Sequence, residues 1–252
     1  MVAERTFRAM GTTCHVIVRS GGERHLDRAQ QHIEDLEAKW SRFRPTSELC
    51  RLNANAGRTC VVSKATRDVV AKAVNAWHIT DGLYDPTVLP ALRAAGYTRS
   101  FDPGLPAPDY EPTPSPGCAD IAVGTTTVTL PPHVALDLGG IGKGYAADLV
   151  AADFDDDCCI NIGGDIRVRG TDWVVAVEDP DDLSNDLTTV TLDDNAVATT
   201  SRAKRHWGDG TRHHLIDPRT GAPAATDTVA VTVTAPEAWQ AETQAKAAFL
   251  RS

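Results

Sequence analysis

The sequence predicts an α+β fold with mixed or antiparallel sheets and packed helices. Two observations indicate this class. Segments with strand patterning outnumber segments with helical periodicity, and the two kinds do not alternate strictly as they do in βαβ proteins. The chain has 252 residues with 42% apolar content, enough for one large core or two small interlocked lobes. We therefore expect a single domain over residues 1–252 built from two such lobes.

Four segments are expected to be helical, one of them directly after the glycine-rich turn at residues 137–144 and three others that have signals of their own. In the first of these three, apolar residues recur at intervals of three and four between Leu26 and Trp40, which is the stripe of an amphipathic helix. The second covers about residues 64–80, with Ser63 as its N-cap. The third begins near Pro236, because proline is favoured in the first turn of a helix.

The other patterned segments are short strands. The first lies within residues 11–20, where Cys14, Val16 and Val18 share one face. Further strands are expected near residues 120–123, 126–130, 134–137, 158–162, 165–169, 173–178, 188–192, 196–200, 212–216 and 229–234. Residues 102–117 contain six prolines and little else that could pack, which predicts a surface loop.

Composition excludes several classes of protein. The net charge of −9 argues against nucleic-acid binding, which normally needs a concentrated basic surface. No stretch approaches the roughly 18 apolar residues of a membrane span, and the N-terminus lacks a secretory segment. We expect a soluble, cytoplasmic protein, or one whose leader has been removed. The six cysteines contain no CxxC pair, and we interpret them as small core residues of a protein from a reducing compartment.

The most informative motif is the glycine-rich turn DLGGIGKG at residues 137–144, between a strand-like and a helix-like segment. Glycines allow backbone N–H groups to approach a phosphate closely, and the N-terminus of a helix adds positive potential. Lys143 can add a full charge to the same anion. The spacing is neither a Walker A loop nor a Rossmann fingerprint, and a plain strand-to-helix turn is the alternative interpretation.

Three further motifs are weaker when taken singly. The segment NIGGDIR at 161–167 is most simply a hairpin turn between two apolar strands. The segment HHLIDPRTG at 213–221 combines a turn with two histidines and an arginine, a typical supply of proton-transfer and phosphate-binding groups. The segment DGLYDPT at 81–87 could simply end one helix and cap the next.

The order of these motifs resembles the ApbE family of FAD:protein FMN transferases. FRAMGT at 7–12 is similar to the family's opening MGT element, and SRFRPTSELCRLN at 41–53 to its S-x-F-x-x-x-S-E-L-S-R-L-N segment. The elements DPTV, DLGGIxKGYAxD, NxGGD and HxIDPRTG then follow in family order. The resemblance extends from about residue 7 to 249, nearly the whole chain.

This resemblance implies a T-fold-like protein that binds FAD with Mg²⁺ between separated glycine- and aspartate-rich loops. Such enzymes cleave the FAD pyrophosphate, release AMP and attach FMN to a threonine of an acceptor flavoprotein. His214 matches the histidine of HxIDPRTG and is the candidate base for the threonine hydroxyl, while Lys143 would hold phosphate. The resemblance places cofactor-binding residues at Met10, Asn53, Tyr84, Asp85, Asp137, Gly139, Gly140, Lys143, Asp165, Thr199, His214 and Asp217.

Among these residues, Asp137 and Asp217 are expected to orient loops rather than to react. Arg219 has two interpretations, as a phosphate contact or as the partner in a turn-stabilising ion pair.

The chain departs from the family at its metal motif. Family ligands include a backbone carbonyl, here that of Gly142, and an Asp and a Thr in the last helix, where this chain has Glu242 and Lys246. Glutamate can still supply oxygen to Mg²⁺, but a charged lysine cannot. Lys246 is therefore a candidate catalytic residue whose ammonium takes the place of the cation and neutralises the pyrophosphate. An intrahelical ion pair between Glu242 and Lys246 is the alternative.

Three functions are compatible with this sequence. The first is transfer of FMN from FAD to a protein threonine, with release of AMP. The second keeps the cleavage of FAD but uses water or another non-protein hydroxyl as the acceptor. The third is a flavin-binding module without turnover. The chain has no evident D-G-x-[ST]-[GS]-A-T acceptor motif, so modification of the chain by itself is not expected.

Overall fold

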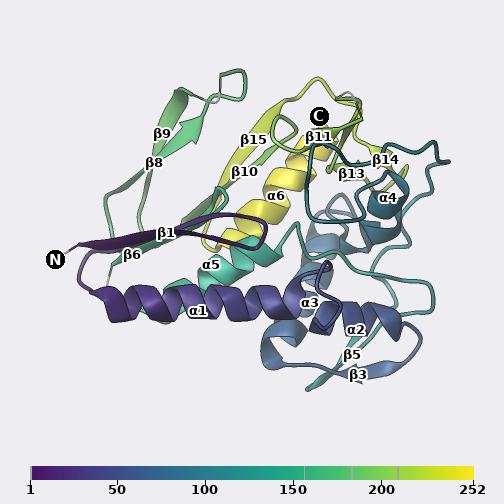
Figure 1. The fold of residues 1–252 in the computed structure, drawn as a ribbon, viewed down its shortest axis with the longest axis horizontal. Coiled ribbons are helices and arrows are strands. Elements are labelled where there is room, and N and C mark those ends of the chain that lie inside the picture. Colours follow the sequence, from purple (N-terminus) through teal and green to yellow (C-terminus); the bar gives the residue numbers. More distant parts are fainter. Residues whose placement is uncertain (1, 156, 183, 209) are drawn as a thin grey trace. The chain divides into compact units, whose positions relative to one another are not determined.

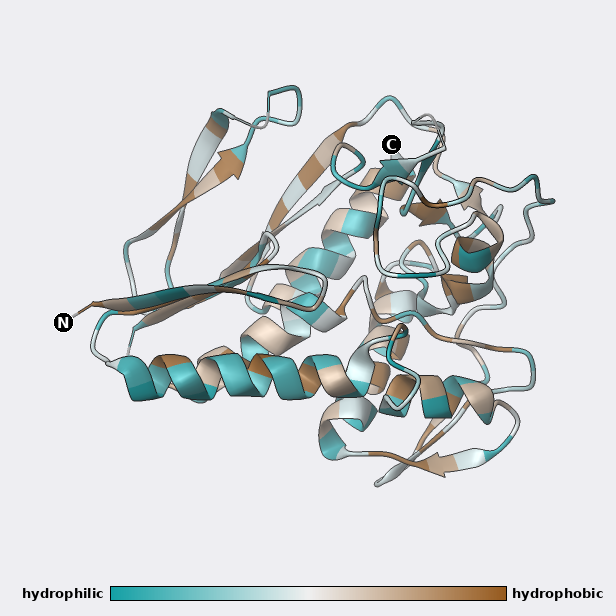
Figure 2. Ribbon diagram, viewed as in Figure 1, coloured by the Kyte–Doolittle hydropathy of each residue, from teal (hydrophilic) through white to brown (hydrophobic). Residues whose placement is uncertain are grey.

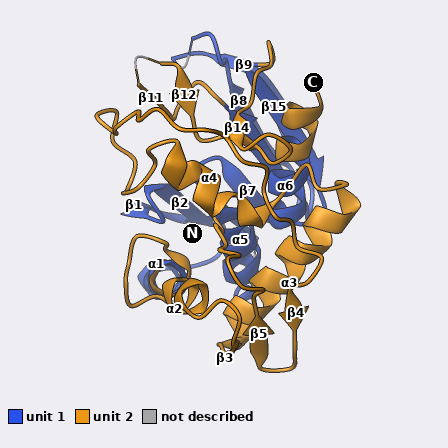
Figure 3. Cartoon of the chain, turned by 90° about the vertical axis from the view of Figure 1, so that its right-hand side faces the viewer, with its two compact units in different colours: residues 1–37, 141–201, 229–245 blue, residues 38–140, 202–228, 246–252 orange. Residues whose placement is uncertain are grey.

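A computed structural model of the chain describes residues 2–155, 157–182, 184–208 and 210–252. Its contacts define two compact units, coloured separately in Figure 3. Unit 1 comprises residues 1–37, 141–201 and 229–245, and unit 2 comprises residues 38–140, 202–228 and 246–252. Helices and antiparallel sheets occur in both units, which confirms the α+β class (Figure 1).

Unit 1 is built on a six-stranded sheet in which every neighbouring pair is antiparallel. In spatial order its strands are β1 (Ala3–Ala9), β2 (Thr12–Val18), β6 (Cys158–Ile162), β7 (Asp165–Arg169), β10 (Ala196–Ser201) and β15 (Ala230–Ala235). The predicted inner face of β2 is confirmed, because Cys14, Val16 and Val18 are fully buried. A separate hairpin joins β8 (Trp173–Glu178) to β9 (Asp186–Leu192).

Two tight hairpin turns fix the register of this sheet. Gly163 and Gly164 connect β6 to β7 with φ angles of 65° and 94°, which confirms the hairpin expected at NIGGDIR. Met10 and Gly11 connect β1 to β2 with φ angles of 52° and 70°. A methionine with positive φ is uncommon, since its Cβ crowds the backbone there.

Three helices contribute to unit 1. The first helix, α1 (Glu23–Trp40), has the predicted amphipathic stripe, and Figure 2 shows hydrophilic and hydrophobic residues interspersed along it. The second, α5 (Gly142–Ala152), packs on β6 and β7. The third, α6 (Ala238–Arg251), begins two residues after Pro236. Asp148 of α5 accepts the first N–H groups of α6, from Ala238 at 2.8 Å and Trp239 at 3.0 Å, which would otherwise lack partners.

Unit 2 combines helices with small sheets of two or three strands. Its elements are α2 (Glu48–Ala54), β3 (Thr59–Val61), α3 (Lys64–Ile79), the 3₁₀-helix η1 (Pro86–Val88), α4 (Leu89–Ala94), β4 (Ala122–Val123), β5 (Thr127–Thr129), β11 (His206–Trp207), β12 (Arg212–His213), β13 (Ile216–Asp217) and β14 (Ala222–Pro223). The N-cap predicted for α3 is confirmed, because the Ser63 hydroxyl accepts the N–H of Thr66 at 3.3 Å.

Two expectations in this unit are wrong. Residues 134–137 do not form a strand. The side-chain amide of Asn53 instead pairs with the backbone there, donating to the Leu136 carbonyl at 2.9 Å and accepting the Leu136 N–H at 2.8 Å. The strand expected over 212–216 is divided into β12 and β13.

The proline-rich segment 102–117 contains no helix or strand, as predicted, but it is not merely a surface loop. Leu105 is 5% exposed and belongs to a core cluster with Leu92, Tyr97 and Trp207. The segment is therefore held by apolar packing that its composition did not indicate.

All six cysteines are free thiols. Four of them are buried, as the interpretation as core residues predicts, whereas Cys50 and Cys60 are only partly buried. Within the described ranges, every helix is too short or too polar to span a bilayer.

Candidate functional site

Two buried carboxylates of unit 1, those of Asp165 and Glu242, form a charged cluster with Lys143. Lys143 lies in the first turn of α5, Asp165 begins β7, and Glu242 lies on α6. The Lys143 ammonium forms ion pairs with the Asp165 carboxylate and, at 2.8 Å, with Oε1 of Glu242. Oε2 of Glu242 accepts the backbone N–H of Gly144 at 3.1 Å. Sequence motifs far apart in the chain thus meet in one arrangement of two carboxylates and one ammonium.

These contacts fix the charge state of Lys143. Burial by itself lowers the pKa of the ammonium, but the negative charges of Asp165 and Glu242 outweigh burial and raise the pKa above its ordinary value. Lys143 therefore remains charged, and its charge already compensates two neighbouring carboxylates. Its predicted contact with phosphate stays a prediction.

The arrangement around Glu242 does not fit a magnesium site. Both carboxylate oxygens of Glu242 already accept hydrogen bonds, and one of the donors is a cation. Gly142, the other expected ligand, is the first residue of α5, where its carbonyl belongs to the hydrogen-bonding ladder of the helix. Among the residues with described positions, no group of three or more His, Cys, Asp or Glu side chains is placed to hold a metal ion.

In unit 2, the beginning of the glycine-rich turn is fixed by Asp137. Its Oδ1 accepts the N–H of Gly139 at 2.7 Å, and its Oδ2 pairs with Nε of Arg42 at 2.6 Å. The two side chains of this ion pair are 11% and 6% exposed. Asp137 therefore orients the turn and gives it a shape before any ligand arrives.

Arg42 is a residue that sequence reasoning missed, because it occupies a variable position of the segment at 41–53. Its guanidinium carbon lies 4.2 Å from the ring centre of Phe43 and 4.4 Å from that of Tyr97. Nη1 donates to the Tyr97 carbonyl at 2.8 Å. The position is held by aromatic stacking, which no local sequence pattern predicts.

Gly140 brings the turn against Lys246 and Tyr84. A Cβ placed on Gly140 would lie 2.8 Å from Cε of Lys246 and 3.2 Å from Cε2 of Tyr84. No Cβ has room there unless the lysine side chain moves. The glycine thus allows the end of the Lys246 side chain to lie directly over the backbone of the turn, although the two residues are more than 100 positions apart.

Tyr84 is buried and is followed by the capping residue Asp85. Oδ1 of Asp85 accepts the N–H of Thr87 at 2.7 Å and its hydroxyl at 2.6 Å, which starts η1. Burial raises the pKa of the Asp85 carboxyl. The cap expected at DGLYDPT is therefore present, and any contact of these residues with a flavin stays a prediction.

The two adjacent histidines differ in their hydrogen bonds. Nε2 of His213 donates to the Ala224 carbonyl at 3.1 Å, and its Nδ1 accepts the N–H of Leu215 at 3.3 Å. Both nitrogens of His213 are therefore used within the fold. Nδ1 of His214 faces the Arg205 carbonyl at 3.4 Å, and since a carbonyl only accepts, Nδ1 carries the proton and Nε2 keeps its lone pair.

Burial and the neighbouring positive charges also favour the neutral form of His214. Burial, followed by the positive charges of Arg205 and Lys246, lowers the pKa of His214 well below its ordinary value. The imidazole is therefore neutral at pH 7 and has a proton-accepting nitrogen. His214 and Lys246, both chosen from the sequence, influence each other in the folded chain.

Asp217 and Arg219 form an ion pair within the turn after β13. The Arg219 side chain donates to both carboxylate oxygens, with the shortest contact 2.8 Å from Nη2 to Oδ2. Nη2 also donates to the carbonyl of Leu250 at 3.0 Å. Of the two interpretations of Arg219, the structure contains the ion pair. Burial alone would raise the pKa of the Asp217 carboxyl, but the hydrogen bonds and the charge of Arg219 outweigh burial and lower it.

The remaining predicted site residues lie in unit 1. Met10 occupies the strained position of the β1–β2 turn. The hydroxyl of Thr199 on β10 is 2.8 Å from that of Thr232 on β15, on the exposed side of this strand pair. Neither residue belongs to the charged cluster around Lys143.

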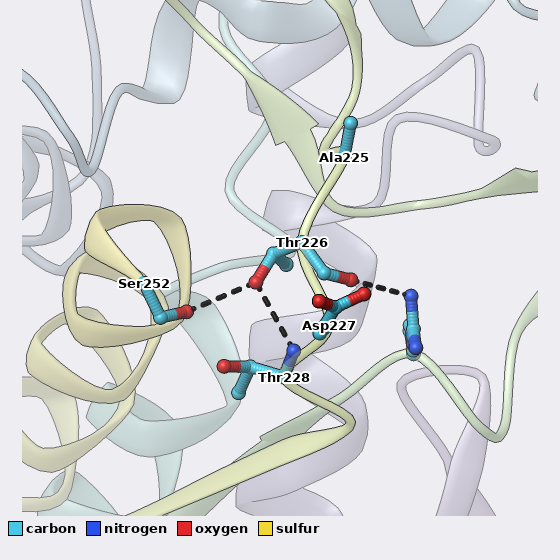
Figure 4. Close-up of a pocket in the computed structure, with 6 residues that line it drawn as sticks. Ala225, Thr226, Asp227, Thr228 and Ser252 are labelled. Carbon is cyan, nitrogen blue, oxygen red and sulfur yellow. Dashed lines mark hydrogen bonds between the residues drawn. The ribbon is translucent and has the colours of Figure 1, made fainter.

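An open cavity of about 640 Å³ in unit 2 contains none of the predicted residues (Figure 4). It is lined by Arg202, Ala225, Thr226, Asp227, Thr228 and Ser252. Its polar groups bond to one another: Arg202 donates to the Thr226 carbonyl at 2.7 Å, and the Thr226 and Ser252 hydroxyls are 3.2 Å apart. Its lining contains no aromatic or large aliphatic side chain that would hold a flavin ring.

Comparison with known proteins agrees with the motif order. A protein named FAD:protein FMN transferase from Haemophilus influenzae is 28% identical over 93% of this chain and 76% of its own length. One of the same name from Vibrio cholerae is 30% identical over 80% of this chain and 65% of its own length. The crystal structure of the ApbE protein from Thermotoga maritima has a TM-score of 0.88 at 27% identity, covering 99% of this chain and 87% of that one.

The flavin transferase ApbE from Vibrio cholerae has a TM-score of 0.81 at 26% identity, again over 99% of this chain and 87% of that one. The model of the ApbE family matches residues 10–252, nearly the whole sequence. With its sequence motifs, its fold and this match in agreement, the chain belongs to the ApbE family.

Proposed function

We propose that this chain is an FAD:protein FMN transferase, which moves FMN from FAD to a threonine hydroxyl of an acceptor protein and releases AMP. The relatives that carry this name support the proposal. The observation that carries it is the state of His214, a neutral histidine with an unprotonated Nε2 whose charge environment includes Lys246. Such a group is able to take a proton from an acceptor hydroxyl at neutral pH.

In the proposed reaction, Nε2 of His214 removes the proton of the threonine hydroxyl as the oxygen attacks the phosphorus of the FMN half of FAD. The new P–O bond forms as the bond to the bridging oxygen breaks, and AMP leaves with that oxygen and its electron pair. The N–H of Gly139 is held by Asp137, so Gly140 would offer its backbone N–H to the diphosphate, and Lys246 would supply a positive charge beside Gly140. Asp137 would keep the turn in shape throughout.

The test is to incubate the purified chain with FAD and a threonine-containing acceptor domain of a flavoprotein. AMP is measured by chromatography, and protein-bound FMN is measured by its fluorescence in a denaturing gel. We expect both products to appear in equal amounts. His214→Ala should lower transfer by roughly 100-fold or more, the usual contribution of a general base. His78→Ala, which removes an exposed histidine elsewhere in unit 2, serves as the matched control.

Each alternative function gives a different result. AMP with free FMN and no modified acceptor would indicate an FAD pyrophosphatase. Stoichiometric binding of FAD without AMP would indicate a flavin-binding module. Full transfer by His214→Ala would remove the assignment of His214 as the base.

A further inference from the structure

The carboxylates that would attract a metal ion in this chain already have a cation. Asp165 and Glu242 share the Lys143 ammonium, and their side chains are 4% and 2% exposed. The second oxygen of Glu242 accepts the N–H of Gly144. A divalent ion bound at Glu242 would have to displace a buried ammonium and leave that charge without its partners, which is costly in a site with so little water.

A different cation lies against the glycine-rich turn. Lys246 follows Glu242 by one turn of α6, and the end of its side chain lies over Gly140. Its charge is close enough to His214 to lower the pKa of the imidazole. Lys246 therefore lies beside both the turn proposed to bind the diphosphate and the histidine proposed to act on the acceptor.

We propose that Lys246 neutralises the diphosphate of FAD in place of a divalent cation, so that this chain binds FAD without metal. This inference rests on the proposed function, since it assumes that FAD is the ligand of the turn. An ammonium provides up to three N–H donors to phosphate oxygens without the strict octahedral geometry that Mg²⁺ demands. The N–H of Gly140 would add positive potential at the same phosphates, since those of Gly139 and Gly144 are donated to Asp137 and Glu242.

Two measurements test the proposal without requiring turnover. The first titrates the apo protein with MnCl₂, followed by the EPR signal of free Mn²⁺, with FAD absent and then present. We expect no saturable site with one ion per chain. The second measures FAD binding through quenching of flavin fluorescence in EDTA and in MgCl₂. We expect the two dissociation constants to agree within about twofold.

Variants of Lys246 make the test specific. Lys246→Met keeps an unbranched side chain without the charge, and it should weaken FAD binding roughly 10- to 100-fold, the value of a hydrogen bond to a charged group. Lys246→Arg should bind FAD nearly as well as the wild type, because its charge is retained. Lys64→Met removes an exposed lysine whose ion pair is local to α3, and it should leave FAD binding unchanged.

Three results would overturn the inference: a stoichiometric Mn²⁺ site, loss of FAD binding in EDTA that MgCl₂ restores, or unchanged FAD binding by Lys246→Met. Failure of the proposed function has a different signature. Tight FAD binding in EDTA that depends on Lys246, but with no AMP and no modified acceptor, would refute the transferase and leave this inference intact.

Discussion

Replacement of Lys143 by methionine removes one cation and leaves two carboxylates in place. The side chains of Asp165 and Glu242 are almost inaccessible to water, at 4% and 2% exposure, so solvent cannot substitute for the lost ammonium. Breaking a buried ion pair by removal of one partner typically costs about 3–5 kcal/mol. Glu242 keeps its hydrogen bond from Gly144, which places the expected loss for Lys143→Met near the lower end, at about 3 kcal/mol at pH 7.

This loss should depend on pH with a defined sign. Without the ammonium, burial favours the neutral form of Asp165 and Glu242, so the folded variant binds more protons than its unfolded chain. Its stability should therefore rise relative to the wild type as pH falls from 7 toward 5. Urea unfolding monitored by tryptophan fluorescence, at both pH values, measures the difference. The double variant Lys143→Met with Glu242→Gln should recover part of the loss, because one uncompensated charge is removed.

Lys64→Met is the control for loss of a lysine, because the side chain of Lys64 is 83% exposed. Its free energy of unfolding should stay within about 0.5 kcal/mol of the wild type. A loss below about 1 kcal/mol for Lys143→Met, or a loss that does not change between pH 7 and pH 5, would refute the bridging role of Lys143.

Three other changes probe unit 1. Burial raises the pKa of Asp148 to about 7, so its contribution to stability is fully present below about pH 4 and is lost as pH rises through 7; Asp148→Asn should flatten this part of the pH–stability curve in urea titrations. Gly144→Ala would place a Cβ 2.6 Å from the Ala238 carbonyl oxygen and should cost about 1–3 kcal/mol, whereas Gly22→Ala, with open space around it, should be tolerated in the same assay. Met10→Gly relieves a positive φ and should raise the free energy of unfolding by up to about 1 kcal/mol, while flavin fluorescence should report weaker FAD binding if Met10 lines the flavin pocket as the resemblance implies.

The local sequence pattern was sufficient to predict those elements whose limits are set by the residues next to them. Strands β6, β7 and β8 have the residue limits that their apolar runs predict, because a glycine or an aspartate lies next to each boundary. The start of α3 follows from Ser63 alone. By contrast, β1 was missed because its sequence, AERTFRA, is largely polar. That strand exists through its pairing with β2, and a polar sequence gives no hydrophobic indication of such a partner.

The side-chain partners within the site could not be predicted for a related reason. Lys143 finds Asp165 and Glu242 at separations of 22 and 99 residues, so no spacing rule connects them. Likewise, the amide of Asn53 substitutes for a neighbouring strand at Leu136, 83 residues away. Motif order identified the candidate site residues, whereas the fold decides which of them meet.

The two departures in the last helix therefore have to be interpreted together. Glutamate at 242 is one methylene longer than the family's aspartate, and in this chain its oxygens reach Lys143 and the N–H of Gly144. A carboxylate held by an ammonium is a weaker metal ligand, because much of its charge is already neutralised. Threonine at 246 would then add only a neutral oxygen beside Gly140, whereas lysine adds a charge at that place. Reversing one change alone should consequently fail to build a metal site: Lys246→Thr should lose FAD affinity without gaining Mn²⁺ binding, and only its combination with Glu242→Asp should create one.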